Sequence, residues 1–486
     1  MVAKSLILDN TFPEVAVAAA GGHSGVINPD EYFLEKIELV TAGQRLDLKA
    51  QMIELSYYED IFRGTITGHL LLSDAISLID RQALCGTEVL IIKYKKSNQA
   101  QYSFDKIFRV YRIGNRVMQT GSSEIYTIDF CSEELFLSEQ LKISKAFTGK
   151  KISEIVENIL VEDMKIKNDV NKKLVIIEES KGLYDFIIPY KKPYEAINWL
   201  ATYALPSKNP GADFIFYENS FGLNFRSLQT LYDQTPYRTF TYSMRTVGDR
   251  GKKGEIGIAL SGIKSYSFLD TFDTLYSTNL GIFANKTITI DPLTRSYYTT
   301  IFNYSKYMSR AKTLNDNPII SANKNVLGKA AYENENAVLK VLTTNRNQKK
   351  AQGIDPSYVA NDINAEIYVP NRTAQLALSH YSRLKLAVSG DPLLSVGLTI
   401  NVILPSMRSP DGSGNQAGDV DRYHSGKYII TAVRHIMDNS MKYETVLEVA
   451  KDSLENPLPY SESNVYSPNQ NKNPHAPASG SVKRTT

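Results

Sequence analysis

The sequence predicts an α+β fold that is mostly β, in which two β modules of similar plan flank an α+β domain. A glycine opens a β-branched and aliphatic run at residues 84–92 and again at residues 395–403. Two further strand-like runs follow each of these in the same order, at 108–113 and 122–130, and at 428–433 and 440–447. The hydrophobic period changes from strand-like to helical after Thr148. Because a trimer of such chains would present six modules, the repeat favours a ring or tube.

Length and composition limit the class of protein. A chain of 486 residues is long enough for about three domains of ordinary size. Lys and Arg number 55 against 52 acidic residues, a net charge of +3, which lacks the basic excess typical of nucleic-acid binding. The 30 tyrosines favour half-exposed sheet surfaces and wet interfaces. Cys85 and Cys131 are too few for a disulfide framework, and both are expected as buried thiols.

Targeting and membrane segments are not expected. The apolar stretch from Val15 to Ala20 is too short and alanine-rich for a secretory signal. No run approaches the roughly 18 apolar residues that a membrane helix requires. The sequence therefore predicts a protein that is made and folded in the cytoplasm, without membrane insertion.

The first elements form an arm and a β module. Residues 1–30 are rich in alanine and glycine and are expected as an extended N-terminal arm. The first module is expected at residues 31–145. In it, residues 46–55 and 65–72 have strand patterning, residues 57–62 are predicted to form a polar-aromatic turn, and a short helix is predicted over 75–84.

Residues 146–262 are predicted to form the α+β middle domain. Ile152, Ile155, Val156, Ile159 and Leu160 recur at the spacing of an amphipathic helix. A second helix is predicted after Pro193, with Trp199 packed on the sheet, and the strand-like runs are residues 174–177 and 214–217.

The rest of the chain is predicted to hold the second module and its interruptions. We expect this module to be assembled from residues 263–310 and 371–456, around an insertion at 311–370 that has few large apolar groups. Its residues 384–388 are predicted to pair with residues 399–404. The tail, residues 457–486, is rich in Ser, Asn, Pro and Lys and is expected to be disordered.

The titratable residues do not form a catalytic or metal-binding pattern. The six histidines are scattered: His23, His69, His380, His424, His435 and His475. No two of them have the spacing of a zinc helix, and no Cys-x-x-Cys occurs. The acidic pairs Glu133-Glu134 and Glu178-Glu179 could serve glycoside hydrolysis, but adjacent acids on a strand face opposite ways, so surface charge is expected.

Three glycine-rich loops also lack the residues that a phosphate-binding loop, a nucleophile elbow or a calcium loop requires. Residues 248–254 lack the Lys-Ser or Lys-Thr of a phosphate-binding loop. Residues 21–25 lack the spacing of a nucleophile elbow, and the calcium-like loop at 411–415 would place Arg422 where a bidentate glutamate is required. The sequence therefore predicts no catalytic residues, no cofactor and no metal, and the protein is expected not to be an enzyme.

Four blocks of the chain, taken in order, resemble the baseplate hub proteins of contractile-tailed bacteriophages, a family related to the base of type VI secretion spike proteins. The blocks begin at Tyr57-Tyr58-Glu59-Asp60, Ile187-Ile188-Pro189-Tyr190, Val388-Ser389-Gly390-Asp391 and Gly426-Lys427-Tyr428. The resemblance implies two tube-like β-barrel domains around the α+β domain, and a homotrimer whose six barrels form a pseudo-sixfold ring. It spans about residues 31–456; the arm, the insertion and the tail depart from the smaller members.

The implied function is that of a structural tail hub in the virion baseplate, assembled in the host cytoplasm. Such a ring joins the tail tube, or a tube-initiator protein, to the central spike protein. It also contacts baseplate wedge proteins and lets DNA pass during genome ejection without specific binding. A receptor-binding or cell-wall-degrading tail protein remains the alternative.

Overall fold

The computed structural model describes most of the chain. The described residues are 30–41, 44–81, 84–96, 103–119, 123–166, 174–242, 261–292, 295–319, 328–335, 338–343, 365–379, 381–406 and 420–458. The predicted arm and tail therefore lie almost wholly outside the described residues, as does most of the predicted insertion. The described fold is mostly β.

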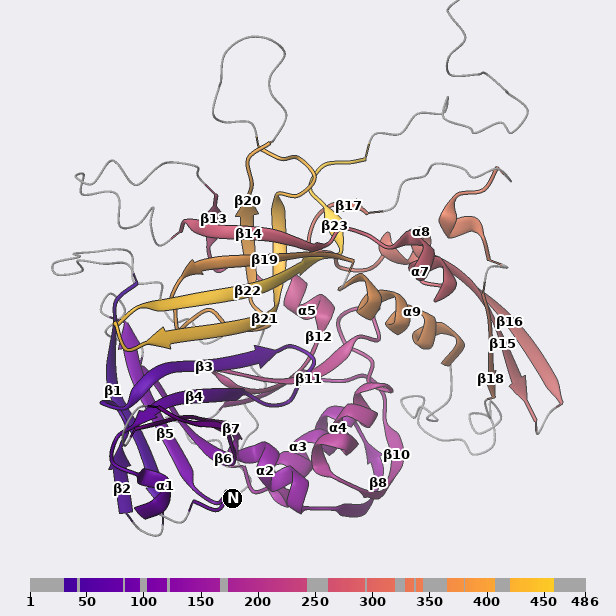
Figure 1. The fold of residues 1–486 in the computed structure, drawn as a ribbon. Helices are drawn as coiled ribbons and strands as arrows, with labels where there is room; N and C mark the ends of the chain where they lie inside the picture. The colour runs from indigo at the N-terminus through magenta and orange to yellow at the C-terminus, as the bar shows by residue number, and fades with distance from the viewer. Residues whose placement is uncertain are drawn as a thin grey trace, which may run out of the picture.

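Seven strands build the first β module, with a single turn of helix between the fourth and fifth (Figure 1). They are β1 (Tyr32–Thr41), β2 (Gln44–Asp47), β3 (Met52–Asp60), β4 (Thr67–Asp74), β5 (Val89–Lys96), β6 (Ser103–Met118) and β7 (Glu124–Ser132), and the helix is α1 (Leu78–Arg81). Buried side chains alternate with half-buried ones along β4 and β5, so that one face of each strand is buried.

Helices and short strands make up the middle part. The helices are α2 (Glu133–Gln140), α3 (Ile152–Asn158), the π-helical turn η1 (Ile159–Asp163), α4 (Pro193–Ala201) and α5 (Leu228–Tyr232). The strands are β8 (Ile143–Lys150), β9 (Leu174–Ile177), β10 (Tyr184–Lys191), β11 (Phe214–Asn219) and β12 (Gly222–Ser227). The apolar stripe of α3 and η1 packs with α4 in one core, which confirms the two predicted helices.

The second β module is interrupted by a separate small sheet. The strands of the second module are β13 (Thr239–Thr241), β14 (Ile263–Asp270), β19 (Ser382–Ser389), β20 (Thr399–Ile403), β21 (Gly426–Asp438) and β22 (Tyr443–Lys451). The small sheet, at the right edge of Figure 1, has the order β16-β15-β18 and consists of β15 (Ala284–Asp291), β16 (Ser296–Asn303) and β18 (Leu339–Thr343).

The remaining elements are helices, a turn and short strands. They are α7 (Thr274–Asn279), α8 (Tyr304–Met308), β17 (Asn317–Pro318), the 3-10 turn η2 (Ala331–Glu333), α9 (Ala365–Leu378) and β23 (Ser453–Leu454). Of residues 263–310, only β14 joins the sheet of the second module, because β15 and β16 pair with β18 instead.

The strands of the two modules follow the same order in one continuous sheet. Among the described residues this sheet has 13 strands. The first module contributes the order β3-β4-β7-β6-β5-β1, and the second contributes β14-β19-β22-β21-β20-β13. Each module thus contains an antiparallel meander, β5-β6-β7 or β20-β21-β22. Each meander is preceded by a glycine with positive φ, Gly86 at 86° and Gly397 at 84°.

Local irregularities repeat as well. The pairing of β6 with β7 shifts between Val110 and Arg112, and the pairing of β21 with β22 shifts between Ile430 and Ala432. A bulge is a specific local feature, so its recurrence at the same place supports a common plan for the two modules. No sheet of the described residues closes on itself as a barrel.

Three expectations about local structure and packing were wrong. Residues 57–60 continue β3 and do not form a turn, because they pair with β21 of the second module and the Tyr57 ring is buried against it. Strand β19 pairs with β14 and β22, and not with β20, so residues 384–388 and 399–404 do not form a hairpin. Cys85 is exposed, whereas Cys131 is buried as predicted.

Candidate functional site

The two β modules are joined by a direct strand pair. Residues Ala432–Asp438 in the second half of β21 pair antiparallel with residues Glu54–Asp60 of β3. Figure 1 shows β21 and β3 side by side where the two modules meet. A ladder of backbone hydrogen bonds fixes the register of the two strands, so the modules are not free to slide past each other. We call this strand pair the module joint.

Aromatic side chains from both modules pack across the module joint. Tyr57 of β3 stacks on His435 of β21, with ring centroids 4.5 Å apart. The Tyr57 and Tyr94 hydroxyl oxygens are 2.6 Å apart, and the Tyr443 hydroxyl lies 2.6 Å from Nδ1 of His435. Tyr443 and Met437 belong to the second module but pack in the hydrophobic core of the first. The joint is therefore part of a core and not a surface contact.

Burial determines the charge state of this cluster. His435 is fully buried, and this burial lowers the pKa of its imidazole to about 3. Burial also raises the pKa of the Tyr57 hydroxyl well above its usual value. His435 is therefore neutral at physiological pH and acts as a packed hydrogen-bonding group.

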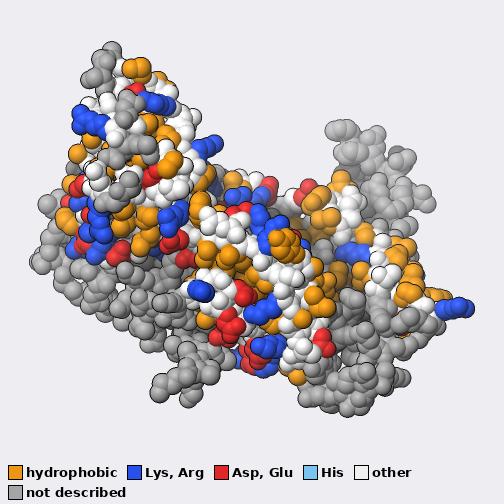
Figure 2. Space-filling model, turned by 90° about the horizontal axis from the view of Figure 1, so that it is seen from below, with side chains coloured by type: hydrophobic (Ala, Val, Ile, Leu, Met, Phe, Trp, Pro, Cys, Tyr) orange, Lys and Arg blue, Asp and Glu red, His pale blue; other side chains and the backbone are white. Residues whose placement is uncertain are grey.

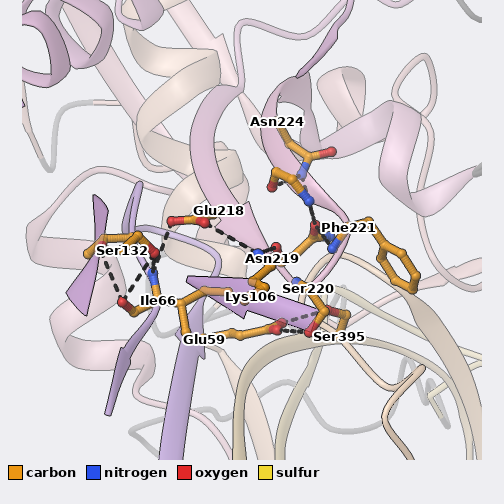
Figure 3. A network of polar contacts seen from close by, with 12 residues as sticks. Glu59, Ile66, Lys106, Ser132, Glu218, Asn219, Ser220, Phe221, Asn224 and Ser395 are labelled. Atoms are coloured by element: carbon orange, nitrogen blue, oxygen red, sulfur yellow. Dashed lines mark hydrogen bonds and ion pairs between the residues drawn. The ribbon is translucent and has the colours of Figure 1, made fainter. Parts of the chain in front are cut away.

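A polar cluster lies where the middle part meets both modules (Figure 3). The turn between β11 and β12 carries Asn219 and Ser220 into this position. We call the cluster the polar junction; its members are Glu59, Lys106, Ser132, Glu218, Asn219, Ser220 and Ser395. All of these residues are buried, so their polar atoms depend on one another for hydrogen bonds.

On the side of the first module, the polar junction is an ion pair with added hydrogen bonds. Nζ of Lys106 lies 3.3 Å from Oε1 of Glu218 and donates to the carbonyl oxygen of Asn219 at 2.8 Å. The backbone N–H of Ile66 donates to Glu218 at 3.2 Å. Strands β6 and β11, from different parts of the chain, are thus linked through charged groups. A buried ion pair tolerates little displacement, because moving either partner leaves an uncompensated charge.

Glu59 links three parts of the chain. Its carboxylate, on β3, accepts hydrogen bonds from the hydroxyl of Ser220 and from the hydroxyl of Ser395 at 2.6 Å. It also accepts the backbone N–H of Val396 at 3.1 Å. Burial raises the pKa of Glu59, although these hydrogen bonds oppose the shift. One side chain of the first module therefore binds the β11–β12 turn and the second module together.

One member of each acidic pair differs from the surface charge that was predicted, whereas Glu133 and Glu179 are half-exposed and form ion pairs. Glu134 is buried in α2, a helix and not a strand. Glu178 is partly buried and accepts hydrogen bonds from Ser227 and Thr230, so it holds the start of α5. Burial raises the pKa of its carboxyl group. The Glu178 carboxylate therefore supports local structure within the middle part.

The tryptophan and the described histidines form local packing and hydrogen-bonding contacts. Trp199 lies on α4 and contacts Phe186 edge-to-face at 5.4 Å, at the margin of the helix–sheet core, as predicted. His424 is bound by Asp421 at 2.8 Å, and His69 lies half-buried on β4. His23, His380, His475 and the loops 21–25, 248–254 and 411–415 lie outside the described residues. In the described ranges, no three potential ligands come together to hold a metal, and no helix is long and apolar enough to span a membrane.

Comparison with known proteins adds a relative of nearly the same length. No family model matches the chain. The probable baseplate hub protein gp334 of Vibrio phage KVP40 is 22% identical over 438 residues, which cover 88% of this chain and 96% of the relative. This chain resembles phage baseplate hub proteins. The resemblance predicted from the four sequence blocks is thereby confirmed.

Two solved structures of tail proteins are also similar to this chain. A tail protein from Neisseria meningitidis MC58 is 11% identical, with 88% of this chain and 100% of that chain covered and a TM-score of 0.47. The 43 kDa tail protein of prophage MuSo2 from Shewanella oneidensis is also 11% identical, with coverages of 86% and 98% and a TM-score of 0.47.

Proposed function

We propose that this chain is a structural baseplate hub protein of a contractile phage tail and has no enzymatic role. Three copies form a ring that joins the tail tube to the central spike, contacts the wedge proteins and lets DNA pass through its lumen. The observation that supports this most strongly is the equal strand order of the two modules in one sheet. Two equivalent modules in each chain allow a threefold assembly to present a sixfold face.

The division of the chain in this proposal follows the expected boundaries. Residues 31–145 and 371–456 supply most of the two tube-like β-barrel domains, and residues 146–262 supply most of the middle domain. Helix α2 packs with the middle part, and β13 pairs with β20 of the second module. Strand β14 adds to the second of these domains from the segment 263–310. The barrels are completed between neighbouring copies, because the large sheet of the described residues has open edges.

The module joint and the polar junction support a mechanical role. A ring of three copies closes only if the angle between the two modules of each copy is fixed. A strand ladder, a shared aromatic core and a buried ion pair together resist changes in that angle.

The charge distribution agrees with DNA passage without binding. Lys, Arg, Asp and Glu side chains are intermingled over the described part of the face in Figure 2. A net charge of +3 on the whole chain also lacks a large basic excess.

Light scattering coupled to size exclusion tests the proposal. The expected mass is three times the 54.4 kDa of one chain at micromolar concentration. A monomer would contradict the hub proposal. A zymogram on purified cell wall addresses the alternative, and clearing of the gel would favour a cell-wall-degrading protein.

A further inference from the structure

Two strand edges of the large sheet have no strand partner among the described residues. Strand β14 ends the sheet and pairs only with β19. Strand β6 pairs with β5 only as far as Arg109, so its second half, from Arg112 to Met118, has β7 alone as a neighbour. Unpaired edges of this kind present a row of free backbone donors and acceptors to another strand.

The two free edges are the counterparts of the two strands in the module joint. By strand order, β6 corresponds to β21 and β14 corresponds to β3. The correspondence extends to the bulges: β3 is irregular between Met52 and Glu54, and β14 is irregular between Ile263 and Ser265. Inside one chain, the second half of β21 pairs with β3. The matching pair, the second half of β6 with β14, is missing from the single chain.

Side chains are buried in the module joint and exposed at the two free edges. Tyr57 of β3 is 0% exposed in the module joint, whereas Phe268 at the corresponding position of β14 is 42% exposed. Val117 and Met118, in the free half of β6, are 61% and 73% exposed. Both edges thus carry large apolar side chains in positions that a paired strand would cover.

We propose that the second half of β6 in one copy pairs antiparallel with β14 of the next copy, and that this pair repeats the module joint between chains. The inference rests on the proposed hub function and names the surface through which that assembly forms. The two surfaces differ, so the contact is head-to-tail and forms a closed ring when three copies complete the circle.

The intramolecular joint also predicts the register between copies. Ile436 lies opposite Ser56 in the module joint. Val117 takes the place of Ile436 when each is matched through its partner, Ile125 on β7 and Glu444 on β22, because β6 has one more residue at a second irregularity between Gly114 and Val117. Ser267 takes the place of Ser56 when residues are counted from the irregularities in β14 and β3. Val117 of one copy should therefore lie directly opposite Ser267 of the next, with Cβ atoms roughly 4.5–5.5 Å apart.

Cysteine cross-linking in the full chain tests this register. The double variant Val117→Cys/Ser267→Cys is prepared with Cys85→Ser, because Cys85 is exposed. Mild oxidation should link it into covalent species of up to three chains on a non-reducing gel, and reduction should return single chains. The matched control is Val117→Cys/Lys264→Cys, whose second cysteine lies three residues away on the same strand; it and the single variants should stay largely unlinked.

A second variant tests the surface without cross-linking. Phe268→Glu places a charge in the proposed contact and should convert the trimer to monomers at micromolar concentration, with an unchanged far-UV circular dichroism spectrum. The control Tyr297→Glu alters an exposed ring of the separate small sheet and should leave the trimer intact.

The outcomes separate the two proposals. A wild-type trimer that does not cross-link through Val117 and Ser267, or that cross-links equally in the off-register control, would overturn the strand pairing and leave the hub proposal standing. A trimer that survives Phe268→Glu would also overturn the pairing. A wild-type monomer would overturn the hub proposal and the pairing with it.

Discussion

Replacing Glu59 by alanine tests whether the polar junction holds the three parts of the chain together. The substitution removes the acceptor for the Ser220 hydroxyl, the Ser395 hydroxyl and the Val396 backbone N–H, all in a buried site. Each buried donor left without a partner costs about 1–3 kcal/mol, and the two hydroxyls can rotate in search of other acceptors, so we expect a loss of about 3–5 kcal/mol.

Urea unfolding followed with two signals measures this loss. Fluorescence of Trp199, the single tryptophan, reports the middle part, and far-UV circular dichroism reports the β modules. The two transitions should coincide in the wild-type protein and separate in Glu59→Ala, because the variant uncouples the β11–β12 turn from both modules.

Two further variants sharpen the Glu59 experiment. Glu59→Gln keeps the shape and most hydrogen bonds, so its cost should be about 1–2 kcal/mol. Asp105→Ala removes an exposed carboxylate next to Lys106 on β6 and should change the stability by less than about 0.5 kcal/mol. A Glu59→Ala protein that unfolds at the same urea concentration as Asp105→Ala, with coincident transitions, would refute the coupling role of this carboxylate.

Other perturbations have equally specific outcomes. The unfolded state takes up a proton on His435 below its ordinary pKa of about 6.5, and the folded state does so only near pH 3, so acidification destabilises the wild type by about tenfold in the unfolding equilibrium per pH unit. The stability difference between wild type and His435→Gln should therefore shrink as the pH falls from 6 to 4 in urea titrations, and a constant difference would be inconsistent with a neutral buried imidazole. Gly390→Ala places a Cβ 2.1 Å from the Tyr443 ring and should lower the free energy of unfolding by more than about 3 kcal/mol, while an unchanged melting temperature would contradict this packing. A thiol reagent should label Cys85 in the native protein and Cys131 only after unfolding, because burial raises the pKa of Cys131 to about 11; rapid labelling of both thiols would argue against the buried position.

The repeated part of the fold could be predicted from the sequence because its signals are local. The runs at 84–92 and 395–403 begin β5 and β20, and the runs that follow them lie in the other strands of the two meanders. Helices α3 and α4 were predictable for the same reason, since the spacing of their apolar residues reflects one buried face.

Long-range pairing could not be predicted in the same way. Residues 57–60 are polar and aromatic, as in a turn, but they form a strand because β21, far along the chain, pairs with them and covers the Tyr57 ring. The partner of β19 was predicted wrongly because hairpin proximity suggested β20, whereas the meander places β22 there.

The polar junction left almost no signal in the sequence. Asn219, Ser220 and Ser395 are ordinary turn and loop residues, and only the meeting of three parts of the chain makes them a buried network. Glu178 was expected on the surface because adjacent acids on a strand face opposite ways, and the sequence does not show that the Ser227 and Thr230 hydroxyls donate to this carboxylate.

The most direct measurement is an electron micrograph of the purified full-length protein viewed down its symmetry axis. If each chain contributes two equivalent modules to one closed assembly, the averaged image should show six similar lobes around an open centre, with threefold differences at the periphery. Particles with three lobes, with twofold symmetry or without a central opening would contradict the account.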